Sequence, residues 1–297
     1  MKTSIALLGT GLMGLPMARR LLGASHQLTV WNRDSSKAKP LESEGARLTE
    51  SPAEAVKDAS HVITMLTDGN VVANVLFESG VAEALSRGST VIDMSSIQPS
   101  QARAHAGRLS ALGVFHLDAP VSGGTGGAEA GTLAIMAGGD EQVFDNSRAM
   151  LEAMGRAIRV GPSGAGQLAK LANQAIVAIA IGAVSEATLL VSDGGGDLTA
   201  FRAALAGGFA DSTILQVHGQ RMQEDDFVAR GRVAVQIKDL DNVLIEAREL
   251  GIKLPMVEAI RDRFVRLADE LDGGNLDHSA LFVELLDLNG RSRRPLV

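Results

Sequence analysis

The chain has 297 residues, of which 45% are hydrophobic and 21% charged, so it can form folded cores and is too long for one ordinary domain. Its net charge of -7, without a basic cluster, argues against nucleic acid as a main partner. The absence of cysteine excludes disulfides, thiol nucleophiles and thiolate metal sites, and a cytoplasmic protein is the default expectation. The most apolar window, residues 175–184, is too short to cross a bilayer, so we expect no transmembrane segment and no membrane partner.

The N-terminus predicts a strand, a glycine-rich turn and a helix. The apolar run 4–8 is followed by a G-x-G-x-x-G turn, and residues 15–22 then have helical periodicity. In such a turn the first glycine permits a tight bend, the second lets the backbone approach a pyrophosphate, and the third allows close helix packing. A second strand, residues 27–31, follows at βαβ spacing. The pattern predicts a dinucleotide-binding domain whose turn contacts the cofactor through Gly9, Thr10, Gly11, Leu12, Met13 and Gly14.

The residues after this second strand indicate which cofactor is bound. An acidic residue there binds a ribose 2′-hydroxyl, whereas arginine suits a 2′-phosphate. The sequence has Asn32, Arg33 and Asp34. Arg33 favours NADP and Asn32 adds no repulsion, while a shift of register would make Asp34 a ribose ligand and NAD the cofactor.

Further alternation of strands and helices predicts a doubly wound, mostly parallel sheet. Ligands of such sheets bind beyond the carboxyl ends of the strands, which places residues 65–67 and 95–96 beside the nicotinamide. The strands are expected at residues 59–66, 90–93, 114–119, 133–137 and 158–160, with a helix at 141–154. The predicted cofactor contacts are Met65, Leu66, Thr67, Ser95 and Ser96.

Residues 118–133 are a second glycine-rich stretch, which we expect to form neither helix nor strand. Consecutive amides of Ser122, Gly123 and Gly124 can form an anion-binding concavity, to which the serine hydroxyl adds a donor. A flexible surface loop is the alternative.

A long helix is expected from residue 164 to 192, about 40 Å in length, which is enough to connect two domains. Lys170, Asn173 and Gln174 share one of its faces. The remainder of the chain has helical patterns only and predicts an all-α domain, with Lys238 as a solvated lysine on pattern alone and 291–295 as a solvated tail. Helices are expected at 198–205, 212–221, 233–250, 255–271 and 279–286, with Pro255 in a first turn and Asp277 or Ser279 as a cap.

A nicotinamide-binding domain implies hydride transfer, and carbonyl reduction also needs a proton donor. The chain has no tyrosine, and its six histidines show no metal-ligand spacing, so we expect no metal site. Lys170 is the candidate acid, because apolar walls lower the pKa of a lysine towards the working pH. From the pattern alone, a surface lysine on a connecting helix is an equal alternative.

The sequence resembles the β-hydroxyacid dehydrogenase family, which includes 3-hydroxyisobutyrate dehydrogenases, almost from end to end. The resemblance implies a Rossmann domain at 1–163, an interdomain helix at 164–193 and an all-α domain at 194–297 that helps subunits associate into a homodimer or homotetramer. This architecture is like that of 6-phosphogluconate dehydrogenase. The matching segments are GTGLMGLPMA at 9–18, DMSSI at 93–97, DAPVSGGTGGAEAGTL at 118–133, GAGQLAKLANQ at 164–174 and KDLDN at 238–242.

The resemblance also implies a role for each matching residue. Lys170 would be the general acid and base, Asn173 would lie beside the substrate, and Ser122, Gly123 and Gly124 would bind its carboxylate. Ser96 and Lys238 would contact the cofactor.

The implied substrates are short β-hydroxy acids and their semialdehydes. KLANQ, KDLDN and DHSAL are most similar to the branch that reduces tartronate semialdehyde. Hydroxyisobutyrate, glyoxylate, succinic semialdehyde and serine are the alternatives. An imine reductase and a non-catalytic dinucleotide-binding module also remain open, although Lys170 counts against both.

Overall fold

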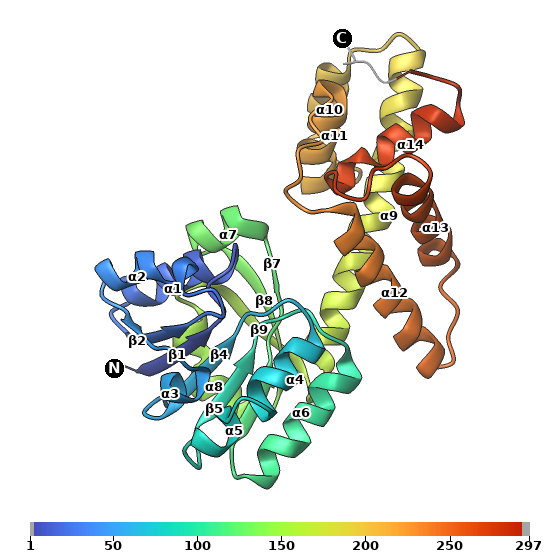
Figure 1. Ribbon diagram of the computed structural model, residues 1–297. Coiled ribbons are helices and arrows are strands. Elements are labelled where there is room, and N and C mark those ends of the chain that lie inside the picture. Colours follow the sequence, from blue (N-terminus) through green and yellow to red (C-terminus); the bar gives the residue numbers. More distant parts are fainter. Residues whose placement is uncertain (1–2, 293–297) are drawn as a thin grey trace. The chain divides into compact units, whose positions relative to one another are not determined.

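The structure, a computed structural model, describes residues 3–292, so most of the expected solvated tail lies outside the described residues. The chain forms two compact units, an N-terminal unit that ends at Lys170 and a C-terminal unit that begins at Leu171. Helix α9 (Ala165–Asp193) contributes to both. Figure 1 shows the α/β layers of the first unit and the helices of the second.

A nine-stranded sheet forms the centre of the N-terminal unit, and its order is β3-β2-β1-β4-β5-β6-β8-β7, with β9 paired to β8. The pairs from β3 to β6 are parallel, and β8 runs antiparallel to β6 and β7. The prediction of a doubly wound, mostly parallel sheet is confirmed. The strands are β1 (Ser4–Leu8), β2 (Gln27–Trp31), β3 (Arg47–Leu48), β4 (His61–Thr64), β5 (Thr90–Asp93), β6 (Phe115–Asp118), β7 (Val121–Ser122), β8 (Leu133–Gly139) and β9 (Gly155–Gly161).

Helices cover both faces of this sheet, which explains why its inner strands β1, β4 and β5 are almost wholly buried. In β1, Ile5 and Leu7 pack into a core with α1, α2 and α8, while Ala6 and Leu8 pack into another with α3, α4 and α6. The helices are α1 (Gly14–Gly23), α2 (Lys39–Ser43), α3 (Pro52–Val56), α4 (Gly69–Phe77), α5 (Val81–Ala84), α6 (Pro99–Ala111), α7 (Gly124–Ala130) and α8 (Glu141–Leu151), with a 3-10 turn at Ser35–Lys37.

The expectation that residues 118–133 contain neither helix nor strand is wrong, because they form β7 and α7. The segment has little intrinsic helix propensity, since four of the residues that enter and form α7 are glycines. Tertiary packing stabilises this helix instead, because Ala128 is buried in the same core as residues of α1.

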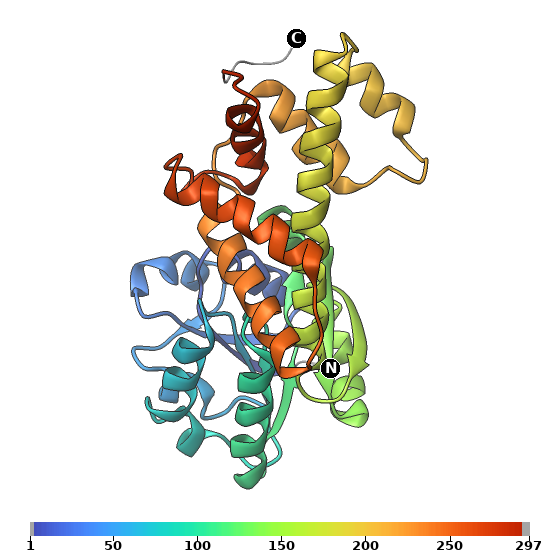
Figure 2. The same ribbon diagram turned by 90° about the vertical axis from the view of Figure 1, so that its right-hand side faces the viewer.

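The C-terminal unit is all-α, as predicted, and its described residues include one isolated β-bridge, Arg232–Asp277, and no strand. Its core gathers apolar residues of α9 and of the helices that follow. Figure 2 shows these helices in yellow to red. They are α10 (Leu198–Leu205), the π-helix Ile214–His218, α11 (Gly219–Glu224), α12 (Val233–Glu249), α13 (Pro255–Asp269), the 3-10 turn His278–Ala280 and α14 (Leu281–Leu288).

Asp277 organises the loops of this unit. Its Oδ1 accepts hydrogen bonds from the backbone N of Ser279 at 3.1 Å and from Arg221 Nη1 at 3.1 Å. Its Oδ2 accepts from the backbone N of Arg230 and of Gly231, each at 3.0 Å. The carboxylate is fully buried, and it caps the turn at 278–280, one of the two caps the sequence predicted.

Helix α9 is long and apolar enough to cross a membrane, so the apolar stretch is longer than the window at 175–184 indicated. Its most apolar 18-residue window is 33% buried. Core helices of water-soluble proteins pass the same test of length and composition, so this helix is weak evidence for a membrane span.

Candidate functional site

The glycine turn between β1 and α1 has the geometry of a phosphate cradle. Gly9 has φ +109°, and a Cβ there would lie 2.3 Å from the carbonyl oxygen of Met65. A Cβ on Gly14 would lie 1.9 Å from the carbonyl oxygen of Gly9, so α1 begins in direct contact with the turn. Gly11 is exposed and has open space where its Cβ would be. The space beside Gly11 at a helix N-terminus fits a pyrophosphate.

Asn32 connects the end of β2 to this turn. Its Oδ1 accepts a hydrogen bond from the backbone N of Thr10 at 2.9 Å, and its Nδ2 donates to the carbonyl oxygen of Asp34 at 2.9 Å. The sequence indicated only that Asn32 would not repel a phosphate. Its side chain in fact holds the glycine turn, a contact between residues 22 positions apart.

The side chain of Asp34 is engaged locally. Its Oδ1 accepts from Ser36 Oγ at 2.6 Å and from the backbone N of Ser36 at 3.2 Å. These bonds to Ser36 lower the pKa of the Asp34 carboxyl, and the charge of Lys37 adds to the effect. Arg33 is exposed beside it.

The loops after β4 and β5 are held by a buried carboxyl group. Asp93 Oδ1 accepts from Thr64 Oγ1 at 2.8 Å and from the backbone N of Ser95 at 3.0 Å. Ser95 Oγ in turn accepts from the backbone N of Leu66 at 2.9 Å. Burial raises the pKa of Asp93 to about 6.

Exposure separates the predicted residues of these two loops. Ser95 is fully buried and its hydroxyl accepts a hydrogen bond from the backbone of Leu66, so this side chain stabilises the loops and does not face a ligand. Ser96, Met65 and Leu66 are partly exposed, and Thr67 is exposed. Met65 lies against Gly9 of the glycine turn, which brings these predicted contacts to the same sheet edge.

The predicted anion-binding residues lie where β7 ends and α7 begins. Gly123 has φ +132° and Gly124 has φ +63°, conformations that glycine adopts readily. Both glycines are exposed, and Ser122 is partly exposed and pairs with Ala134 of β8. The chain therefore turns sharply at an accessible point, as an anion-binding backbone concavity requires.

Lys170 lies in the N-terminal unit, on the second turn of α9 and only partly exposed. The first turn of this helix is anchored to the sheet. Asp118 Oδ1 accepts from the backbone N of Gly164 at 2.7 Å, and its Oδ2 accepts from the backbone N of Gln167 at 2.9 Å. The Gln167 side chain donates to the carbonyl oxygen of Ser95 at 2.8 Å. Neither Asp118 nor Gln167 was singled out from the sequence.

Asn173 and Lys238 belong to the C-terminal unit. Asn173 Nδ2 donates to Gln174 Oε1 at 2.9 Å, and Gln174 Nε2 donates to Asp239 Oδ2 at 2.7 Å. Lys238 Nζ lies 3.5 Å from Asp239 Oδ1, and its side chain is 40% exposed. The buried carboxylate of Asp239 thus contacts both Gln174 of α9 and Lys238. Lys238 therefore has a partner, unlike the solvated lysine that the pattern alone predicted.

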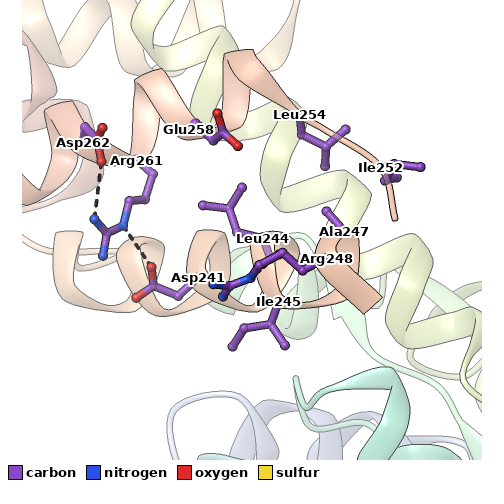
Figure 3. A pocket seen from close by; sticks show the side chains of 10 residues that line it. All are labelled: Asp241, Leu244, Ile245, Ala247, Arg248, Ile252, Leu254, Glu258, Arg261 and Asp262. Carbon is purple, nitrogen blue, oxygen red and sulfur yellow. Dashed lines mark hydrogen bonds and ion pairs between the residues drawn. The ribbon is translucent and has the colours of Figure 1, made fainter. Parts of the chain in front are cut away.

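A separate open cavity of about 620 Å³ lies between α12 and α13 in the C-terminal unit. In Figure 3, Arg261 bridges Asp241 at 2.9 Å and Asp262 at 3.3 Å. None of the predicted site residues lines this cavity.

His218, Asp277 and His278 form a cluster whose possible ligand atoms lie within 4.8 Å of one another. Sequence spacing did not show it, because the two histidines are far apart along the chain. Both oxygens of Asp277 already accept hydrogen bonds, and Arg221 places a positive charge there. Burial lowers the pKa of His218 to about 4. These features fit a packed core cluster better than a cation site.

Two family models match the chain. The one described as the NAD binding domain of 6-phosphogluconate dehydrogenase matches residues 4–161. The one described as NAD-binding of NADP-dependent 3-hydroxyisobutyrate dehydrogenase matches residues 164–285. Together they extend over most of the described chain.

Individual proteins are similar over almost the whole chain. The 2-hydroxy-3-oxopropionate reductase of Escherichia coli (strain K12) is 43% identical over 286 residues, which are 96% of this chain and 97% of that protein. The probable mitochondrial 3-hydroxyisobutyrate dehydrogenase-like 1 of Arabidopsis thaliana is 34% identical over 98% of this chain and 87% of its own length. Among solved structures, Mycobacterium tuberculosis 3-hydroxyisobutyrate dehydrogenase with L-serine has a TM-score of 0.87 at 32% identity, covering 96% of this chain and 99% of that one.

Proposed function

Because the chain belongs to the 3-hydroxyisobutyrate dehydrogenase family and is an NAD(P)-dependent oxidoreductase, we propose that it interconverts a short β-hydroxy acid and its semialdehyde, with 2-hydroxy-3-oxopropionate (tartronate semialdehyde) as substrate. The observation that carries the choice of substrate is the 43% identity over 96% of the chain to an enzyme of that name. The partly exposed Lys170 on an anchored helix supplies the chemistry.

The nicotinamide, when bound, supplies or accepts the hydride. Lys170 donates a proton to the carbonyl oxygen during reduction and removes the proton from the hydroxyl group during oxidation. The amides of Gly123 and Gly124 and the hydroxyl of Ser122 hold the substrate carboxylate, and this fixes the reacting carbon. Asn173 orients the substrate hydroxyl group.

We also propose NADP rather than NAD as the cofactor. The residues proposed to contact it are the glycine turn at 9–14, Met65, Leu66, Thr67, Ser96 and Lys238. Arg33 is exposed at the end of β2, where a guanidinium pairs well with a 2′-phosphate. Asp34 is held by Ser36, so its carboxylate is less available to a ribose 2′-hydroxyl. Asn32 keeps the turn in place by its bond to Thr10.

Serine and hydroxyisobutyrate are the second candidates, since the solved structure at 32% identity is a 3-hydroxyisobutyrate dehydrogenase with L-serine. These compounds share a carboxylate and a β-hydroxyl group with the reduced form of the first candidate. The same residues would bind them, so only turnover distinguishes them.

A second copy of the chain is the proposed protein partner. Ile176 is 68% exposed and Leu190 is 75% exposed on α9, and apolar side chains in such positions favour association. Light scattering after gel filtration would show a dimer or a tetramer, whereas a monomer would contradict this part of the proposal.

The experiment is a turnover screen with tartronate semialdehyde, glyoxylate, succinic semialdehyde, hydroxyisobutyrate and serine, using both cofactors. Lys170→Ala is expected to lower kcat by about 100-fold or more, because it removes the proton donor. The exposed Lys57→Ala is the matched control and should keep full activity.

Cofactor binding is measured separately from turnover. Trp31 is the single tryptophan, the chain has no tyrosine, and Trp31 ends β2 directly before the proposed ribose-binding residues, so a change in its fluorescence is the readout of cofactor binding. Lys170→Ala should bind NADPH as the unchanged protein does. Full turnover by this variant would remove Lys170 from the mechanism, and turnover of cyclic imines alone would replace the proposed function.

A further inference from the structure

The start of α9 is capped by a residue far away in sequence. The carboxylate that accepts its first free N–H groups belongs to Asp118, 46 residues before Gly164 and 49 before Gln167. Helices α3, α4, α8 and α10 are capped instead by the side chain of the residue directly before them, as α8 is by Asp140. A cap from the preceding residue stabilises the helix but does not tie it to any other element. A cap from β6 also fixes the position of the helix N-terminus relative to the sheet.

Gln167 makes a second connection from the same turn. Its Nε2 donates to the carbonyl oxygen of Ser95 at 2.8 Å, and its Oε1 accepts from the backbone N of Ile97 at 3.1 Å. The two bonds enclose Ser96 in the loop after β5. Asp118 and Gln167 are both fully buried, so water does not compete for these bonds.

The contact leaves no room for side chains between the helix and the sheet. A Cβ on Gly166 would lie 2.4 Å from the carbonyl oxygens of both Asp118 and Met136. A Cβ on Gly138 would lie 2.7 Å from Asp118 Oδ1 and 2.7 Å from the backbone N of Gly166. The backbone of α9 therefore meets the strand ends directly.

Chain connectivity relates this contact to the proposed site. Lys170 follows Gln167 by three residues on the same helix, and Ser122 follows Asp118 by four residues. Burial raises the pKa of Asp118, and its bonds to the N–H groups of Gly164 and Gln167 oppose that change. The N-terminal end of a helix also favours a negative charge.

We propose that Asp118 and Gln167 are positioning residues of the reaction, which set the place of Lys170 relative to the cofactor loop at Ser96 and the carboxylate loop at Ser122. The inference rests on the proposed function of Lys170. It extends the site to two buried residues that touch neither substrate nor cofactor. Because a displacement of about 1 Å can lower a rate about 100-fold, small shifts of α9 would be visible in kcat.

The test is a double-mutant cycle with Asp118→Asn and Lys170→Ala. The asparagine keeps the shape but presents an N–H group to one of the two helix N–H groups. We expect kcat to fall about 10- to 100-fold, while the dissociation constant of NADPH, measured by Trp31 fluorescence, changes less than about threefold. If Asp118 acts through Lys170, the double variant is no slower than Lys170→Ala alone.

Asp140→Asn is the matched control, because Asp140 caps α8 by accepting from the backbone N of Val143, and α8 carries no proposed site residue. Because an asparagine oxygen can accept the same single bond, Asp140→Asn should leave both kcat and the melting temperature almost unchanged. Gln167→Met is the second test variant, and we expect the same fall in kcat with little change in the dissociation constant of NADPH. It replaces Asp118→Asn if the Asp118→Asn protein does not fold.

The outcomes separate the two proposals. Unchanged kcat in folded Asp118→Asn or Gln167→Met, or a reduction that multiplies with that of Lys170→Ala, overturns the positioning role alone. Full activity of Lys170→Ala overturns the role of Lys170 and this inference with it.

Discussion

At the scale of single residues, buried or partly buried polar side chains hold the loops of the proposed site in place. Asn32 holds the glycine turn, Asp93 holds the loops after β4 and β5, and Asp239 holds Lys238. In each case the exposed residue that can contact a ligand is a neighbour of the residue that makes the internal bond. Substitution of the exposed residue should therefore weaken ligand binding, whereas substitution of the residue that makes the internal bond should lower the stability of the fold.

Arg33 is a residue of the exposed kind. Arg33→Ala should raise the KM for NADPH at least about tenfold and leave the KM for NADH within about twofold, because a guanidinium pairs with the 2′-phosphate that NADH lacks. Steady-state kinetics with both cofactors measure this. Arg47→Ala, which removes an exposed pair with Glu54, is the control. Equal effects on both cofactors would show that Arg33 does not choose between them.

His116 is a residue of the buried kind. It lies in β6, and neither ring nitrogen has a hydrogen-bond partner within the described part of the chain. Burial lowers its pKa from the usual 6.5 of a histidine to about 3. The neutral ring stabilises the fold above pH 6.5, and this contribution is lost as the pH falls from 6.5 towards 3, because the unfolded chain takes up the proton first.

His116→Leu should therefore make the free energy of unfolding depend less on pH in the acidic range. Between pH 8 and pH 5, the variant should lose about 2 kcal/mol less unfolding free energy than the unchanged protein. Urea unfolding followed by Trp31 fluorescence at the two pH values measures the difference. Parallel losses in both proteins would mean that His116 is protonated in the folded state at pH 5.

At the scale of elements, helix α7 and helix α9 show two different origins of helical structure. Helix α9 has a long apolar sequence that predicts it directly, whereas α7 is glycine-rich and forms because Ala128 is buried. Both begin next to β-strand ends. At the start of α9 a Cβ on Gly166 would meet two backbone carbonyl oxygens, so the position of this helix depends on a backbone contact that a methyl group would break.

Gly166→Ala should lower the free energy of unfolding by about 1–3 kcal/mol or more, because the new Cβ meets two backbone carbonyl oxygens at 2.4 Å and neither can move aside. Gly107→Ala in α6 is the matched control, since Gly107 is helical and exposed and has open space around its Cβ position. It should stabilise the protein by about 0.5–1 kcal/mol. Urea unfolding measures both, and equal signs would contradict the contact at Gly166.

At the scale of the whole molecule, the two units have separate cores. Apolar residues of the sheet and its helices form the cores of the first unit, and residues of α9 to α14 form the core of the second. Trp31, the single tryptophan, lies in the first unit, so its fluorescence reports unfolding there, while far-UV circular dichroism also reports the helices of the second.

Asp277→Ala should destabilise the second unit by about 3–5 kcal/mol, since it leaves the partly buried Arg221 charge and three backbone N–H groups without their acceptor. Circular dichroism should then show helix loss at lower urea, before the Trp31 transition. Asp262→Ala, whose side chain is 75% exposed, should change neither transition. Coincident transitions in Asp277→Ala would show that the units unfold as one.

The sequence by itself determined the alternation of strands and helices, the glycine turn, the long helix and the all-α second half, because each has a local period or a local turn residue. It also singled out Lys170, Arg33 and Ser122 as chemically suited groups. Only the tertiary structure decided that Asp118 and Gln167 anchor the helix of Lys170 and that α7 forms at all. These features rest on contacts between residues tens of positions apart, and no local pattern encodes the distance between two such residues.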